Sequence, residues 1–237
     1  MALRDLSLKH EYRSDRDDVV SEFFIPCLTN SIQYDRTIEF ISVKSLSTLT
    51  FGLENIEHDH AKIRLVSGHR FTTSDLDAIT KLFDQRNPGR LNGRLYLDKK
   101  ISSLIQDSKI RQLKKIIEDF KLEVKVAIPN SEYVDGAFEE RMGIFRDTND
   151  DAVAFSGTSN VTFDAENRNF ESVDVFTSWD DKARVETKIK NFENLWANKT
   201  NYVEIYDLVY AEKKNLLKYT TRPCQNQTGF RTQIYYF

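Results

Sequence analysis

The chain has 237 residues, of which 40% are hydrophobic and 12% aromatic, with only 8 glycines and 4 prolines. This composition favours a packed domain and excludes a disordered chain or an array of glycine-rich repeats. The formal net charge of -3 excludes a global basic field, so any binding site for nucleic acid must be a local patch.

The N-terminus and the cysteines indicate a cytoplasmic protein. The first residues, MALRDLSLKHEYRSDRDD, are charged throughout and lack the apolar stretch of a signal peptide. No window of the sequence approaches the ~20 apolar residues that span a membrane, so we expect no membrane partner. Cys27 and Cys224 belong to no metal-ligand spacing, and we expect two reduced thiols rather than a disulfide.

Strand and helix patterns alternate along the first half of the chain. Apolar residues at helical spacing, runs of β-branched residues and capping residues identify the elements. They predict a loose polar segment at 1–18, a helix beginning near Val19, a strand at 37–43, a helix at 45–56, a strand at 61–68 and a helix at 72–85.

The second half of the chain continues this alternation around a hairpin. It predicts a long amphipathic helix at 99–121, a strand at 122–128, a hairpin within 136–160, a strand at 171–179, a helix at 181–197, a strand at 202–209 and a short helix near 211–218. Alternation of this kind is typical of an α/β domain with one mixed sheet covered by helices on both faces.

A turn-rich basic stretch at 86–100 is the best local candidate for contact with nucleic-acid phosphates. It holds a single acid, Asp98, and Tyr96 offers a stacking surface. Its basic side chains are Arg86, Arg90, Arg94, Lys99 and Lys100. The alternative interpretation is a solvated loop that precedes a helix.

Several stretches resemble, in order, the nuclease-type members of the phospholipase D superfamily. They are EFFIPCLTNSIQYDRTIEFISVKSLSTLTFGL, AKIRLVSG, FEERMGIFRD, AVAFSGTSN, NFESVDVFTSW and FENLW, and the resemblance covers residues 19–210. Such members occur in restriction and phage-defence proteins and in front of DEAD/DEAH-type helicases. The resemblance implies the phospholipase D-like sandwich, a mixed sheet of about seven strands with helices on both faces. A polar segment at 1–18 precedes this domain, and a C-terminal helix and tail at 211–237 follow it.

The resemblance also implies an activity, the hydrolysis of DNA phosphodiester bonds. In the family, the histidine of a His-x-Lys motif attacks phosphorus and forms a phosphohistidine. Lysine and asparagine hold the phosphoryl oxygens, and a glutamate orients the imidazole. This chemistry needs no metal and no cofactor. The implied partners are DNA, a second copy of the chain in a homodimer that shares the site, and a helicase or another defence-system protein.

In this sequence the motif is altered at its reactive residue. Glu139 stands where the family has the histidine, and Arg141 stands where it has the lysine. The remaining positions are matched by Asp147, Gly157, Thr158, Asn160 and Glu171. A carboxylate at position 139 excludes the phosphohistidine mechanism, so we expect a degenerate and impaired catalytic centre.

Three interpretations of the altered motif remain open. In the first, the scaffold serves as an inactive nucleic-acid-binding, dimerisation or assembly module, in which Glu139 and Arg141 pair with each other or across a dimer. In the second, Glu139, Asp147 and Glu171 hold a divalent cation that binds phosphate. In the third, a partner chain supplies the catalysis. The similar triplet from His60 to Lys62 is not the motif, because no Gly-Ser-x-Asn follows at the right distance; we expect a loop entering a strand there.

Overall fold

The computed structural model describes residues 1–43, 61–72, 121–130, 136–158 and 170–220, together with Leu46, Asp75, Leu76, Ile79, Thr80, Phe83, 113–117, Asp119 and Glu132. Its strands are β1 (Glu11–Arg13), β2 (Gln33–Ile38), β3 (Lys62–Gly68), β4 (Arg70–Thr72), β5 (Leu122–Pro129), β6 (Met142–Arg146), β7 (Ala152–Gly157), β8 (Ser172–Thr177), β9 (Val203–Asp207) and β10 (Lys218–Thr220). Its helices are α1 (Ile25–Thr29), α7 (Lys182–Trp196) and α8 (Leu208–Lys213), with a 3₁₀ turn at Leu3–Asp5 and a π turn at Val20–Phe24 that continues into α1.

Within this part of the chain, eight strands form one mixed sheet in the order β1-β8-β7-β6-β2-β3-β5-β9, and β4 pairs with β10 in a separate two-stranded sheet. The neighbours β2, β3 and β5 are parallel, while the pairs β2–β6, β6–β7, β7–β8 and β5–β9 are antiparallel. The strands β2, β3, β5 and β7 therefore end at one edge of the sheet, where β6 and β8 begin. We call this edge the carboxyl edge.

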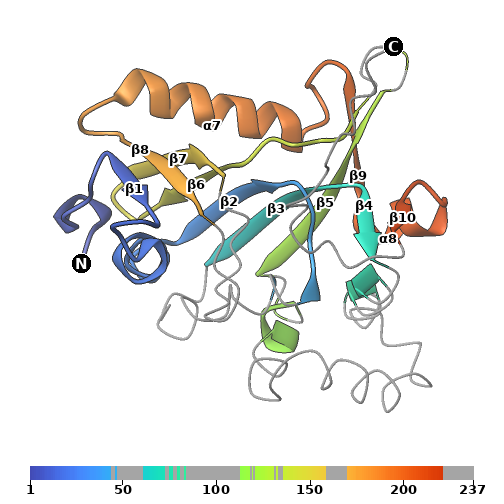
Figure 1. The fold of residues 1–237 in the computed structure, drawn as a ribbon, viewed down its shortest axis with the longest axis horizontal. Coiled ribbons are helices and arrows are strands. Elements are labelled where there is room, and N and C mark those ends of the chain that lie inside the picture. Colours follow the sequence, from blue (N-terminus) through green and yellow to red (C-terminus); the bar gives the residue numbers. More distant parts are fainter. Residues whose placement is uncertain are drawn as a thin grey trace, which may run out of the picture.

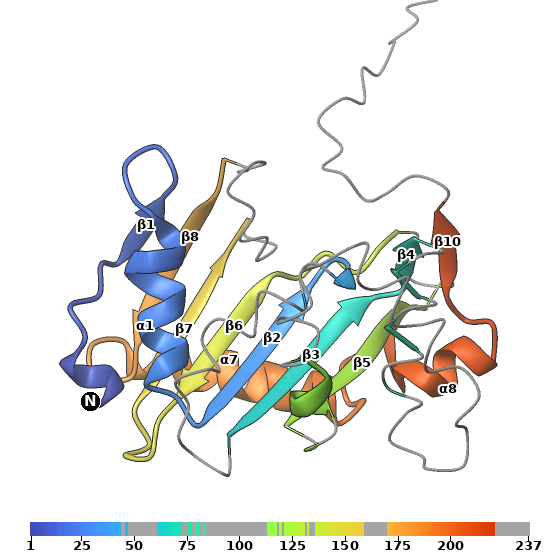
Figure 2. The same ribbon diagram turned by 90° about the horizontal axis from the view of Figure 1, so that it is seen from below.

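Helices cover both faces of the sheet, as Figures 1 and 2 show, with α7 on one face and α1 on the other. On the α7 face, Val185, Phe192 and Leu195 pack in one apolar cluster with residues of β3, β5, β6 and β7. On the α1 face, Phe23 lies against Phe155, with ring centroids 5.3 Å apart. The α/β class and the mixed sheet with helices on both faces are thus confirmed, with eight strands in the main sheet rather than about seven.

Three expectations about single elements are wrong in detail. Residues 1–18, expected to be loose, contain β1, which pairs antiparallel with β8. The strand expected at 37–43 lies earlier, as β2, because its charged residues Asp35 and Arg36 break the apolar pattern and are nevertheless buried. The short helix expected near 211–218 is α8, which begins at Leu208 and is followed by β10.

Other expected elements fall where the structure describes few residues. The helices expected at 45–56, 72–85 and 99–121 lie largely outside the described residues. The residues described within these ranges are helical with three exceptions. Thr72 ends β4, and Asp119 and Lys121 follow the helical residues of the range 99–121. No helix among the described residues has the length and apolar character needed to cross a membrane.

A buried carboxylate joins α7 to the sheet. Asp35 in β2 is fully buried, and its two oxygens accept bonds of 2.7 and 2.8 Å from the guanidinium of Arg64 in β3. The other side of the Arg64 guanidinium donates to Glu193 of α7, at 2.6 and 3.2 Å. Arg146 Nη2 adds bonds of 3.2 Å to Asp35 and 3.1 Å to Glu193. These four side chains therefore fix α7 over β2, β3 and β6.

The pKa values in this network follow from its hydrogen bonds. Burial alone lowers the pKa of Arg64, but its bonds to Asp35 and Glu193 outweigh burial and raise that pKa. The bond from Arg64 lowers the pKa of Glu193 below its usual value. Both groups therefore stay charged at neutral pH, which the pairing requires because an unpaired buried charge is strongly destabilising.

Close approach of β7 and β8 at the carboxyl edge requires glycine at position 157. A Cβ atom built on Gly157 would lie 2.0 Å from the backbone oxygen of Ser172 and 2.9 Å from Cα of Val173. Both obstacles are backbone atoms, so no side-chain rotation relieves the overlap. The strands would have to separate at the place where Thr158 and Ser172 meet.

We predict that Gly157→Ala lowers the free energy of unfolding by about 1–3 kcal/mol, because overpacking against backbone forces a strand shift. Urea unfolding followed by circular dichroism measures the change. The matched control is Gly136→Ala, since a Cβ on Gly136 meets no atom within 4 Å. Equal stability of the two variants would contradict the close packing of β7 on β8.

Candidate functional site

Arg141 lies at the carboxyl edge, directly before β6. Its carbonyl accepts a hydrogen bond of 3.2 Å from the amide of Gly157, which places it beside the end of β7. Its guanidinium forms an ion pair with Glu39, the residue that follows β2. Both side chains are about a quarter exposed, at 25% and 27%. Arg141 is therefore accessible and already holds a carboxylate.

This pairing corrects one expectation. In one interpretation Arg141 pairs with Glu139 or across a dimer; within the chain its partner is Glu39 rather than Glu139, and pairing across a dimer stays a prediction. Glu39 was missed because the sequence pattern placed it inside the strand expected at 37–43, whereas it directly follows β2. In open sheets, ligands bind outside the carboxyl ends of parallel strands.

Thr158 and Glu171 lie at the adjacent ends of β7 and β8, on one side of Arg141, and hydrogen bonds hold both. Thr158 donates its amide to the Ser172 carbonyl, and its hydroxyl accepts from the Ser172 amide, both at 3.0 Å. The Glu171 amide donates to the Ser14 hydroxyl at 2.7 Å, and the Glu171 carbonyl accepts from the Ser14 amide at 3.0 Å. The predicted residues Arg141, Thr158 and Glu171 thus come together on the ends of β6, β7 and β8.

Arg36 of β2 is a second cation at this edge that the sequence did not single out. It is 2% exposed, and its guanidinium carbon lies 4.6 Å from the ring centroid of Phe155. Burial lowers the pKa of Arg36, while the charge of Glu171 acts in the opposite direction. Gly143 of β6 leaves room for the Phe155 ring against which Arg36 lies, since a Cβ there would lie 2.3 Å from Phe155 Cζ and 3.3 Å from Arg36 Cδ.

Glu139 is exposed and belongs to the segment that crosses the carboxyl edge before β6. The segment starts over the end of β3, where the Phe138 carbonyl lies 3.2 Å from the position of a Cβ on Gly68. It then passes through Glu139 and Glu140 to Arg141. The exposed carboxylates of Glu139 and Glu140 therefore directly precede Arg141 in this segment.

His69 is the histidine that the structure describes nearest in sequence to the end of β3, and it is buried at 3% exposure. Burial lowers its pKa, and its hydrogen-bond partner is the backbone of Ala127 in β5. It thus lies on the side of β3 away from β6, and it does not stand in for the missing histidine.

Asp147, predicted as a site residue, lies at the opposite end of β6. The six residue steps from Arg141 to Asp147 correspond to roughly 20 Å along an extended strand. The carboxylate of Asp147 is 4% exposed and accepts bonds from the amides of Leu3, Asn149 and Asp151, at 2.8, 2.9 and 3.1 Å. The prediction was wrong because a motif fixes the order of residues but not the end of the strand to which each belongs.

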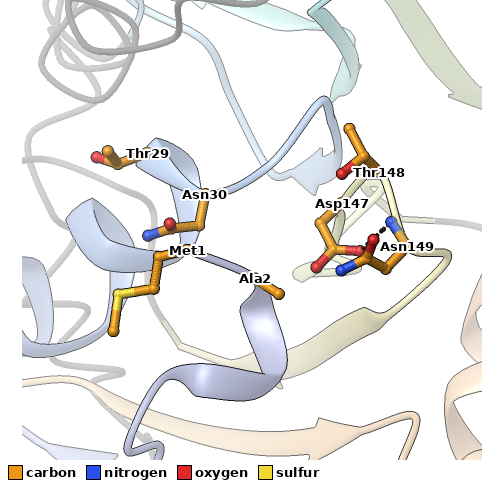
Figure 3. Close-up of a pocket in the computed structure, with 7 residues that line it drawn as sticks. All are labelled: Met1, Ala2, Thr29, Asn30, Asp147, Thr148 and Asn149. Atoms are coloured by element: carbon orange, nitrogen blue, oxygen red, sulfur yellow. Dashed lines mark hydrogen bonds between the residues drawn. The ribbon is translucent and has the colours of Figure 1, made fainter.

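The hairpin turn at Asp147 borders a shallow cavity of about 280 Å³ (Figure 3). Its lining residues are Met1, Ala2, Thr29, Asn30, Asp147, Thr148 and Asn149. Figure 3 shows the Asp147 carboxylate turned toward Asn149, whose amide it binds. This cavity lies at the far edge of the sheet and is separate from Arg141.

A divalent-cation site formed by Glu139, Asp147 and Glu171 is excluded by this geometry. All three are described, and the described residues contain no group of three histidine, cysteine or acidic side chains arranged to hold a metal ion. The interpretation based on a rewired metal centre is therefore wrong.

Other predicted residues remain untested. Asn160 and the basic residues at 86–100, namely Arg86, Arg90, Arg94, Lys99 and Lys100, lie outside the described residues, as do His60 and Cys224. Lys62 begins β3 at the edge opposite Arg141 and pairs with Glu123 at 2.8 Å, in line with a loop entering a strand.

Comparisons with known proteins find similarity among solved structures, of which 18 chains match. No protein-family model matches the chain, and no curated protein matches it. Among solved structures, NucT from Helicobacter pylori is similar, with a TM-score of 0.45 and 10% sequence identity over 83% of this chain and 97% of that chain.

We predict that Asp147→Ala destabilises the protein. It leaves buried amides without their acceptor, each at a cost of about 1–3 kcal/mol. Asp147→Asn, which keeps one carbonyl oxygen, should lose less. Urea unfolding followed by circular dichroism measures both changes. Unchanged stability of Asp147→Ala would contradict a structural role for this carboxylate.

Proposed function

We propose that this chain is a phospholipase D-like domain of the nuclease type that binds nucleic-acid phosphate at the carboxyl edge without cleaving it. The observation that carries the proposal is the position of Arg141 at the head of β6, paired with Glu39 and with Thr158 and Glu171 on one side. These are the positions at which the family's motif holds a phosphate. The resemblance in sequence supplies the family, and the grouping of the side chains supports it.

Arg141 has the chemistry that a phosphate contact needs. A guanidinium is permanently charged and offers a planar fork of donors that matches either a carboxylate or a phosphate. Glu39 now occupies that fork. A phosphate therefore binds by exchange, with the Glu39 carboxylate returned to water as the phosphate oxygens take its place.

The surrounding charges favour weak binding and oppose catalysis. Besides Arg141 itself, the charged side chains at this edge are Arg36, Glu39, Glu139 and Glu171, whereas Glu140 lies near Lys188 of α7. Carboxylates outnumber guanidiniums in this group, and a carboxylate at ~4 Å from a phosphate costs on the order of 4 kcal/mol at an effective dielectric constant near 20. With Glu139 in place of the nucleophile, no phosphohistidine forms. Affinity thus depends on further basic residues, for which Arg86, Arg90 and Arg94 are the candidates.

The partners belong to the same proposal. Where a family member carries one motif, two chains meet so that both motifs face one phosphate, and we propose a homodimer for this protein. DNA is the proposed ligand, and a helicase or another defence-system protein in the cytoplasm is the proposed context. The rival function, an assembly module without nucleic-acid binding, is favoured by the internal pairing of Arg141 with Glu39.

We predict that Glu39→Gln raises affinity for DNA by about 1.5- to 5-fold, since it removes a competing ion pair of about 0.2–1 kcal/mol. Arg141→Ala should lower affinity and reduce the slope of log K against log salt by ~0.9, the value for one lost phosphate contact. Fluorescence anisotropy with a labelled duplex over a salt series measures both. Arg184→Ala, which removes an exposed arginine of α7, is the control. No DNA binding by the parent chain would leave the assembly module as the function.

We predict further that the parent chain is inactive and that the double variant Glu139→His, Arg141→Lys gains phosphodiesterase activity. The reason is that the histidine restores a nucleophile and the lysine restores its phosphate contact. Release of nitrophenol from bis(p-nitrophenyl) phosphate, with and without EDTA, is the measurement. Glu139→Gln, Arg141→Lys is the matched control without a nucleophile. Activity of the parent that withstands EDTA would contradict the proposed loss of catalysis.

A further inference from the structure

Phe170 is exposed at the carboxyl edge, directly before Glu171. Its exposed fraction is 63%, and among the large apolar residues that the structure describes only Met1 is more exposed. A phenylalanine in water forgoes the free energy that burial provides, about 1.5–3 kcal/mol. Single exposed apolar residues are common on proteins, so the surroundings of Phe170 must decide whether it has a role.

The backbone beside Phe170 is held on two strands. Glu171 exchanges hydrogen bonds of 2.7 and 3.0 Å with Ser14, and Arg13 of β1 pairs with Ser172 of β8. A ring carried on a fixed backbone loses little conformational entropy when a ligand stacks on it. Phe170 is therefore preorganised for contact.

A cation lies over one side of the ring. The guanidinium carbon of Arg13 is 4.8 Å from the Phe170 ring centroid. Arg13 also approaches Asp15, but this pair is long, at 3.7 Å, and both side chains are more than 40% exposed, so it holds Arg13 weakly. Phe170 is thus an exposed aromatic ring with an exposed cation beside it.

We propose that Phe170 and Arg13 form a stacking platform for an unpaired nucleobase of single-stranded nucleic acid. Every base has a π face, and aromatic rings with adjacent arginines bind single strands by stacking and by cation–π contact. This inference rests on the proposed function, because the phosphate of the same strand would lie at Arg141. Arg141 lies two strand spacings from β8, roughly 10 Å, and is level with Val173, three residue steps from Phe170, so Arg141 and Phe170 are roughly 14 Å apart.

The platform distinguishes single strands from duplexes. Bases in a duplex are already stacked and paired, so they cannot cover Phe170 without being extruded from the helix. A duplex therefore contacts only the cations of this edge, whereas a single strand adds the stacking contribution. The structure thus assigns to Phe170 a preference for single-stranded nucleic acid.

The test compares two labelled oligomers of equal length, an oligodeoxythymidylate and an abasic strand with the same phosphates. Phe170→Ala should weaken binding of the oligodeoxythymidylate by about 5- to 150-fold, which corresponds to ~1–3 kcal/mol for one stacked base, and leave the abasic strand unchanged. Phe170→Trp should retain affinity, and its fluorescence should be quenched by the oligodeoxythymidylate alone. Tyr210→Ala is the matched control, because Tyr210 is also exposed, with Lys214 near its ring, but lies on α8 at the other side of the sheet (Figure 2).

Each outcome decides between the two proposals. The stacking platform would be overturned if Phe170→Ala weakened binding of both oligomers equally or of neither. Phosphate binding at Arg141 would still stand in that case, provided that Arg141→Ala weakens binding of both oligomers. Binding of neither strand by the parent chain would overturn the platform and the proposed function together. Since Phe170 is exposed, the variants are expected to fold, and their thermal unfolding checks this.

Discussion

The fold depends on a carboxylate that has no contact with water. Asp35 sits in the middle of the sheet, and its pairing with Arg64 and Arg146 supplies the hydrogen bonds that a buried charge needs. Because Glu193 completes the same network, α7 is fixed over the strands by ionic contacts as well as by apolar packing. Removing one member would leave another charge buried and unpaired. The network thus sets which helix covers this face and in which register.

The opposite face uses charge differently. There Arg36 is buried against Phe155 and lies near the predicted site, so a cation is kept at the carboxyl edge in surroundings of aromatic rings. The side chains of Asp35 and Arg36, which are neighbours in β2, therefore lie on opposite faces of the sheet and have different roles. One holds the helix layer in place, and the other contributes positive charge to the end of the sheet where Arg141 and Glu39 meet.

The sequence predicted the elements whose periodicity is long or regular. The hairpin of β6 and β7 and the helix α7 lie where their patterns placed them, and the α/β class followed from alternation. Local pattern could not identify β1, which has three residues and is stable only against β8. It also displaced β2, because the partners that allow Asp35 to be buried are distant in sequence.

The candidate site shows the same division. Arg141, Thr158 and Glu171 were found by motif and are brought together by the sheet. Glu39 and Arg36 were missed, since only strand order reveals that the end of β2 lies beside the start of β6. Asp147 was wrongly assigned to the site because it follows β6 whereas Arg141 precedes β6. The two residues are close in sequence but lie at opposite edges of the sheet. The spacing of residues in the sequence therefore indicated a phosphate-binding type of site. The order of the strands in the sheet determines which residues lie together at that site.

The bonds of the N-terminal segment have a consequence for how this protein meets other chains. The amide of Leu3 is bound by Asp147 at the far edge of the sheet, and Ser14 is bound by Glu171 at the carboxyl edge, so the segment between them covers the outer side of β8. A strand that loses its neighbour exposes a row of unpaired amides and carbonyls, which can pair with another molecule. Detachment of the first residues would therefore turn β8 into an open edge. A strand of three residues thus covers an edge that could otherwise pair with another chain.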